Sequence, residues 1–104
     1  MKKPTEVNIL GKTYSIEYCD NPSNVDRSKR QSIWGQIDFW EKDIRVYDNN
    51  ASEAELWDTI LHEVLHGIAE GLKLKGFKDD AGHTELGLIA MALADTLFRN
   101  GWMK

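Results

Sequence analysis

The sequence has few of the residues and runs that define several protein classes. It contains one cysteine, Cys19, among 104 residues. A lone cysteine cannot form an intramolecular disulfide or complete a cysteine-rich zinc knuckle, which is typical of proteins in a reducing compartment. No apolar stretch of signal-peptide length follows the N-terminal lysines, and no apolar run approaches the ~20 residues of a membrane span. We therefore expect a cytoplasmic location and no membrane partner.

Excess positive charge is also absent. The 13 lysine and arginine residues are outnumbered by 17 aspartate and glutamate residues, which gives a formal net charge of -4. Such a chain has no overall basic field to attract phosphate backbones, so we do not expect nucleic-acid binding. Two independent domains in a chain this short would each be close to the size at which folding alone fails. We expect one domain spanning residues 1–104.

The first half of the chain has the pattern of two β-hairpins. Residues 6–18 are rich in β-branched and aromatic side chains around a turn at Gly11. Residues 32–40 alternate between the two sides of a strand, and a short run at 44–47 follows a polar turn. The segment 20–30 between the hairpins is rich in asparagine, serine and charge, which predicts a surface loop.

Two helices are predicted in the second half. Ser52 and Glu55 have the spacing of a capping box, which predicts a helix over about 53–70. A second helical pattern covers about 83–99. The layout is therefore α+β: a small antiparallel sheet of two hairpins followed by two helices.

The first predicted helix carries the pattern H-E-x-x-H at His62, Glu63 and His66. A spacing of four places both imidazoles on one face, where their nitrogens can converge on one Zn²⁺ ion. Glu63 projects about 100° around the helix, where it can accept a proton from a zinc-bound water and pass it to a leaving amine. The pattern predicts zinc ligands at His62 and His66 and a catalytic Glu63. The alternative is an exposed helix face with two unliganded histidines.

A catalytic zinc needs a third protein ligand and an open position for water. Glu85, at the start of the second predicted helix, can reach the ion if the two helices pack antiparallel. We expect His62, His66 and Glu85 to hold the metal. Two alternatives stay open: Glu85 can be an ordinary first-turn acid stabilised by the helix dipole, and His83 is the competing ligand.

The segment DTILHEVLHG at 58–67 resembles the zincin metallopeptidases. Metzincins extend the motif with a glycine and a third histidine, but this chain has Ala69 and Leu72 at those positions. Glu85 on a following helix is instead similar to the gluzincin arrangement. The order of strands, motif helix and glutamate helix resembles the minimal gluzincin-type peptidases often encoded by phages and prophages, and SprT-like and ImmA/IrrE-type proteins are broader relatives.

This resemblance implies a zinc-dependent metallopeptidase acting on a peptide or protein substrate. The substrate would add as an extra strand beside residues 44–47 or their neighbour. Larger thermolysin-like enzymes place an acid one turn after the glutamate ligand, but Ile89 stands there, so Asp58 and Asp95 are the candidates for orienting a histidine. One alternative is a zincin scaffold with little or no turnover that acts as a regulatory or interaction module. Another is a metal-free helical interaction domain with an aromatic surface.

The chain has four tryptophans, which is many for its length. In so small a domain aromatic bulk usually serves to bury enough area, so we expect core packing. Their alternative role is a ligand-stacking surface. The four residues are Trp34, Trp40, Trp57 and Trp102.

Overall fold

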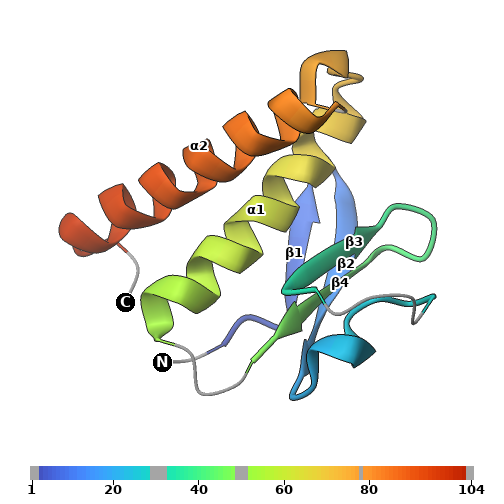
Figure 1. The fold of residues 1–104 in the computed structure, drawn as a ribbon, viewed down its shortest axis with the longest axis horizontal. Coiled ribbons are helices and arrows are strands. Elements are labelled where there is room, and N and C mark those ends of the chain that lie inside the picture. Colours follow the sequence, from blue (N-terminus) through green and yellow to red (C-terminus); the bar gives the residue numbers. More distant parts are fainter. Residues whose placement is uncertain (1–2, 29–32, 49–51, 78, 103–104) are drawn as a thin grey trace.

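The computed structural model describes residues 3–28, 33–48, 52–77 and 79–102. Four strands are followed by two long helices, which confirms the α+β class (Figure 1). The elements are β1 (Glu6–Ile9), β2 (Lys12–Cys19), η1 (Pro22–Asn24), β3 (Gly35–Asp38), β4 (Asp43–Tyr47), α1 (Glu53–Gly71), η2 (Lys75–Phe77) and α2 (Asp80–Arg99), where η marks a short 3-10 helix.

The four strands form one sheet in the order β1-β2-β4-β3. The β1–β2 and β3–β4 pairs are antiparallel hairpins, as predicted. The two hairpins join through a parallel pairing of β2 with β4, in which Ile16 lies opposite Ile44. The expectation of a wholly antiparallel sheet is therefore wrong at this junction. In this order β3 is an edge strand and β4 lies inside the sheet.

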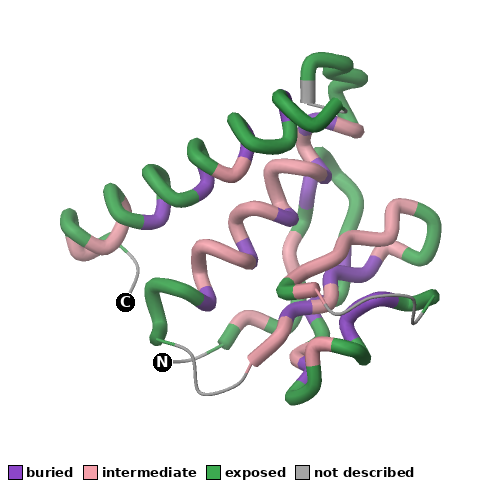
Figure 2. Tube along the Cα trace, in the orientation of Figure 1, coloured by how far each residue is buried: buried purple, intermediate pink, exposed green. Residues whose placement is uncertain are grey.

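One face of the sheet carries the hydrophobic core, and α1 covers it (Figure 2). The β4 residues Ile44 and Val46 are completely buried. Helix α2 packs mainly on α1 and η2, so it forms a third layer (Figure 1). The buried core cluster consists of Ile9, Tyr14, Ile16, Ile44, Val46, Leu56 and Ile60.

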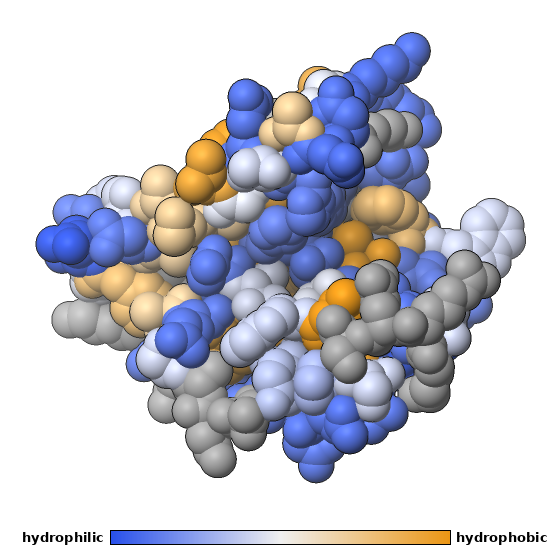
Figure 3. Space-filling model, in the orientation of Figure 1, coloured by the Kyte–Doolittle hydropathy of each residue, from blue (hydrophilic) through white to orange (hydrophobic). Residues whose placement is uncertain are grey.

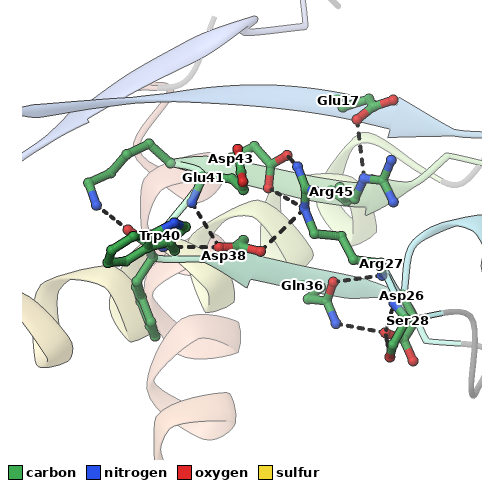
Figure 4. Close-up of polar contacts among 12 residues, drawn as sticks. Glu17, Asp26, Arg27, Ser28, Gln36, Asp38, Trp40, Glu41, Asp43 and Arg45 are labelled. Carbon is green, nitrogen blue, oxygen red and sulfur yellow. Dashed lines mark hydrogen bonds and ion pairs between the residues drawn. The ribbon is translucent and has the colours of Figure 1, made fainter.

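The opposite face of the β3–β4 hairpin is polar and holds the preceding loop (Figure 4). Arg27 forms ion pairs with Asp43 and Asp38. Its main-chain N–H donates to the side-chain oxygen of Gln36 at 3.0 Å, and the Gln36 amide donates to Asp26 at 3.1 Å. Because Gln36 and Asp38 belong to β3, this network anchors the edge strand to the loop.

Side-chain caps set the starts of both helices. Ser52 accepts a hydrogen bond from the Glu55 N–H at 3.2 Å, so α1 begins where predicted. Asp79 accepts one from the Gly82 N–H at 2.7 Å, and α2 therefore begins before the predicted position 83. His83 consequently lies in the first turn of α2, where the helix fixes its direction. In the described part of the chain neither helix is long and apolar enough to cross a membrane.

The tryptophans do not build the core as expected. Trp34, Trp40 and Trp102 are exposed, with Trp40 retaining 90% of its surface, and Trp57 is half-buried against the core. Aliphatic residues and Tyr14 supply the buried volume instead.

Candidate metal centre

Three histidines from the two long helices converge on one point. His62 and His66 extend from α1, and His83 extends from α2. The Nε2 atom of His62 lies 3.1 Å from that of His66 and 3.2 Å from that of His83. The candidate ligand atoms of the three residues all lie within 4.8 Å of one another.

The spacing of these nitrogens fits a shared metal ion. Tetrahedral coordination at 2.0–2.1 Å places neighbouring ligand nitrogens about 3.3–3.4 Å apart. The Nε2 atom of His62 lies close to the Nε2 atoms of both other histidines. A neutral ring nitrogen is either a donor or an acceptor, so direct hydrogen bonds cannot pair all three nitrogens well. A cation accepts all three lone pairs at once. Imidazole nitrogens are suitable ligands for zinc and for several other transition metals.

The surroundings favour the neutral form of the two α1 histidines. Burial, followed by the neighbouring His62 and His83, lowers the pKa of His66 to about 4. The pKa of His62 is also lowered, by burial and then by His83, while Asp58 acts in the opposite direction. Neutral imidazole is the form that binds metals, so these shifts favour ligation near neutral pH.

Glu63 is buried beside the histidines. Only 7% of its surface is exposed, and burial raises its pKa to about 7. A carboxyl group with a pKa near the working pH is well suited to accept and return a proton. The three motif residues therefore occupy the places that helical spacing predicts.

Glu85 does not belong to the histidine group. It is exposed on α2, two residues from His83. Residues two apart on a helix are separated by about 200° around its axis, so their side chains point in nearly opposite directions. The face of α2 toward His62 is marked by His83 and by Gly87, whose added Cβ would lie 3.4 Å from His62 Cε1. The structure thus brings His83, and not Glu85, to the α1 histidines.

The two acids expected to orient a histidine have other surroundings. Asp58 borders the site and interacts electrostatically with His62, but among the described residues no hydrogen bond joins it to an imidazole. Burial raises the pKa of Asp58, and His62 partly offsets this. Asp95 is exposed near the other end of α2 and pairs with Arg99 at 2.8 Å.

Two hollows flank the histidine cluster, and both are bordered by His83. The first, of about 510 Å³, meets the start of β3 and is lined by Ile33, Trp34, Gly35, Asp58, Thr59, His62, Glu63 and His83. The second, of about 440 Å³, is lined by Phe39, His66, Ala69, Glu70, Leu74, Asp79, Asp80 and His83. We call the two hollows together the trough; it borders β3 at Gly35, its first residue, and Phe39, which follows its last. Figure 3 shows polar side chains filling the space between α2 and the β3–β4 hairpin.

The trough is bordered by the edge strand of the sheet. The segment 44–47, the first choice for pairing with a peptide, lies in β4, which is paired on both sides. Its neighbour β3 lies at the edge of the sheet that the described strands form. Because the Trp34 carbonyl accepts from the Tyr47 N–H at 2.8 Å, the alternating ladder directs the main-chain groups of Gly35 and Ile37 away from β4.

Two glycines border the site without being recognisable as site residues from the sequence. Gly35 lies against Glu63, and Gly87 lies against His62. A glycine inside a strand or helix costs about 1 kcal/mol of stability relative to alanine and often marks a place where another segment closely approaches the backbone. The position of each glycine inside a predicted element was therefore the one signal in the sequence. That signal does not reveal what approaches, because the contacts are between distant segments.

Comparisons with protein-family models, curated proteins and solved structures give no match for this chain. The candidate metal centre is therefore defined by its own geometry.

Proposed function

We propose that the protein is a zinc-dependent metallopeptidase. His62, His66 and His83 would hold the ion, and Glu63 would act as the general base. One observation carries the proposal: a buried carboxyl group adjoins three histidines close enough together to hold one metal ion, beside a hollow that reaches the edge strand β3. Three protein ligands leave a tetrahedral ion with one open position, as in catalytic zinc sites.

The residues of the chain divide the chemistry between them. Bound zinc supplies a Lewis acid for the scissile carbonyl and lowers the pKa of a water molecule toward about 7. Glu63 accepts a proton from the attacking water and returns it to the leaving amine. Its burial supports this role, since a pKa of about 7 lets the carboxyl group both take and give a proton near neutral pH.

The substrate in this proposal is an extended segment of a peptide or unfolded protein. It would lie in the trough and pair with the outward main-chain groups of Gly35 and Ile37 on β3. Such pairing recognises the main chain, so sequence preference comes from the hollows. Trp34 walls one hollow and is held by an edge-to-face contact with Tyr47, with ring centroids 5.2 Å apart.

The test compares metal content and cleavage in the same protein preparations. Wild type purified without chelators is expected to contain one zinc per chain and to cleave fluorescently labelled, unfolded casein. Glu63→Gln is expected to keep its zinc and to lose at least about 100-fold in rate, the usual contribution of a general base. Glu55→Gln, exposed on the same helix, is the matched control and should cleave like wild type. Cleavage that survives in Glu63→Gln contradicts the proposal.

A second candidate is a metal-binding scaffold without appreciable turnover that acts through a partner. The exposed apolar side chains of Leu88, Ile89 and Met91 on α2 favour it, because such patches often mark interaction surfaces. Stoichiometric zinc in wild type together with no cleavage of a broad peptide library would support this candidate over the peptidase.

A further inference from the structure

Gly35, the first residue of β3, lies directly against two side chains of α1. A Cβ atom added to Gly35 would lie 2.9 Å from Glu63 Oε2 and 3.2 Å from Glu63 Cγ. It would also lie 2.9 Å from the Cγ2 methyl of Thr59. Favourable contacts between carbon atoms are about 3.5–4.0 Å, so even alanine cannot fit unless something moves.

Backbone conformation does not explain this glycine. The glycines with positive φ in the described residues are Gly11 and Gly101, so Gly35 adopts a backbone that other residues accept. Glycine is required because there is no room for a side chain at this position. The free space at position 35 is occupied by the carboxylate of Glu63.

The strand is less free to move than the glutamate. Gly35 lies opposite Val46, which is completely buried in β4. The preceding carbonyl, that of Trp34, accepts the Tyr47 N–H at 2.8 Å. On the other side of β3, Gln36 and Asp38 are held by the Arg27 network (Figure 4). A side chain at position 35 would therefore displace the end of Glu63.

We propose that Gly35 is a positioning residue for the general base: its bare backbone lets β3 close on Glu63 and holds the carboxylate in place beside the histidines. This inference rests on the proposed function of Glu63. It predicts that the base can be disabled while the metal site stays intact. The three atoms nearest to a Cβ at position 35 belong to Glu63 and Thr59, and none of them belongs to a histidine.

The test compares two glycine-to-alanine variants in zinc-loaded protein with labelled casein as the probe. Gly35→Ala is expected to lower kcat at least about 100-fold, with KM and zinc affinity within about threefold of wild type, because only the base is displaced. Gly76→Ala is the control, because a Cβ there meets nothing within 4 Å. It should keep kcat within about threefold of wild type.

Double variants separate the two contacts at position 35. Glu63→Asp shortens the carboxylate arm by one methylene, so Gly35→Ala with Glu63→Asp is expected to exceed Gly35→Ala alone in kcat. Thr59→Ser removes only the methyl group that alanine would meet, so adding it to Gly35→Ala should restore little. Full rescue by Thr59→Ser, or a Gly35→Ala variant with unchanged kcat, would overturn the proposal.

A measurement that does not depend on cleavage separates this test from the test of the proposed function. The ¹³C resonance of the Glu63 carboxyl carbon, assigned by comparison with Glu63→Gln, should shift in Gly35→Ala and stay in place in Gly76→Ala. If wild type cleaves nothing, the peptidase proposal fails. An unshifted resonance in Gly35→Ala contradicts the positioning role itself.

Discussion

The two long helices both contribute to the histidine cluster, but they are held in place very differently. Helix α1 lies between the sheet and α2, and it supplies Leu56 and Ile60 to the core. Helix α2 packs mainly on α1 and η2, and its outer surface stays exposed (Figure 2). On that surface Leu88 is 55% exposed to solvent. Core packing therefore fixes His62 and His66, whereas His83 depends largely on one helix-to-helix interface.

A metal ion would add a second connection between these helices. It would link the first turn of α2 to the motif on α1, at the end of the interface opposite the C-terminus (Figure 1). Ligand bonds of this kind contribute directly to folding free energy in small domains. Metal binding should therefore matter more to α2 than to α1.

A substitution in the interface between α1 and α2 should change stability the most. Leu86 is 2% exposed on the α1-facing side of α2, so Leu86→Ala should lower the free energy of unfolding by about 2–5 kcal/mol. Leu88→Ala removes the same atoms from the exposed side and should change it by less than about 0.5 kcal/mol. Urea unfolding of both metal-free variants makes the comparison. Equal losses would show that the outer face of α2 is covered in solution.

Zinc removal should come next. At free zinc 100 times above its dissociation constant, binding adds about 2.7 kcal/mol, which corresponds to roughly 10–20 °C in Tm for a domain of this size. Amide hydrogen exchange should then accelerate in α2 far more than in the sheet once a chelator is added. An unchanged Tm, or uniform acceleration across the chain, is the result that this view cannot accommodate.

The third prediction concerns which α2 residue binds the metal. His83→Ala should weaken zinc binding at least about 10- to 100-fold in a competition titration with a chromophoric chelator. Glu85→Ala should change it by less than about twofold, because the Glu85 carboxylate is outside the histidine group. Weaker binding in Glu85→Ala than in His83→Ala would restore the ligand set expected from the sequence.

The smallest effect belongs to the sheet, which serves as the metal-independent reference. Burial, and then Asp48, raises the pKa of Tyr18 to about 12, and the Tyr18 hydroxyl donates to the Pro4 carbonyl at 2.7 Å. The folded state therefore favours the neutral phenol. Its contribution to stability is complete below pH 10 and is lost as the pH rises toward about 12.

Tyr18→Phe should accordingly cost about 1 kcal/mol at neutral pH and should lose less stability than wild type between pH 10 and 12. Urea unfolding across this pH range measures the difference. Zinc should not alter it, since Tyr18 lies in β2 and the histidine cluster lies between the helices. An alkaline loss in the variant as steep as in wild type would rule out Tyr18 as its source.

Local features of the fold and site could be predicted from the sequence. The hairpins, the Ser52 cap and the directions of His62, Glu63 and His66 depend on spacing within one strand or helix. The apolar pattern predicts too late a start for the second helix, because its cap, Asp79, lies outside that pattern. The prediction of core packing is wrong for three of the four tryptophans, because composition alone does not show which side chains face inward.

The α+β class follows from the local patterns of the sequence, and so do the three motif residues of α1, because the helical repeat fixes where residues four apart point. Tertiary packing is what joins the hairpins in parallel, puts β3 at the edge of the described sheet, and brings His83 to the site while Glu85 points away. It also placed Gly35 against Glu63. These features depend on how segments far apart in the chain pack together, and no local spacing encodes that packing.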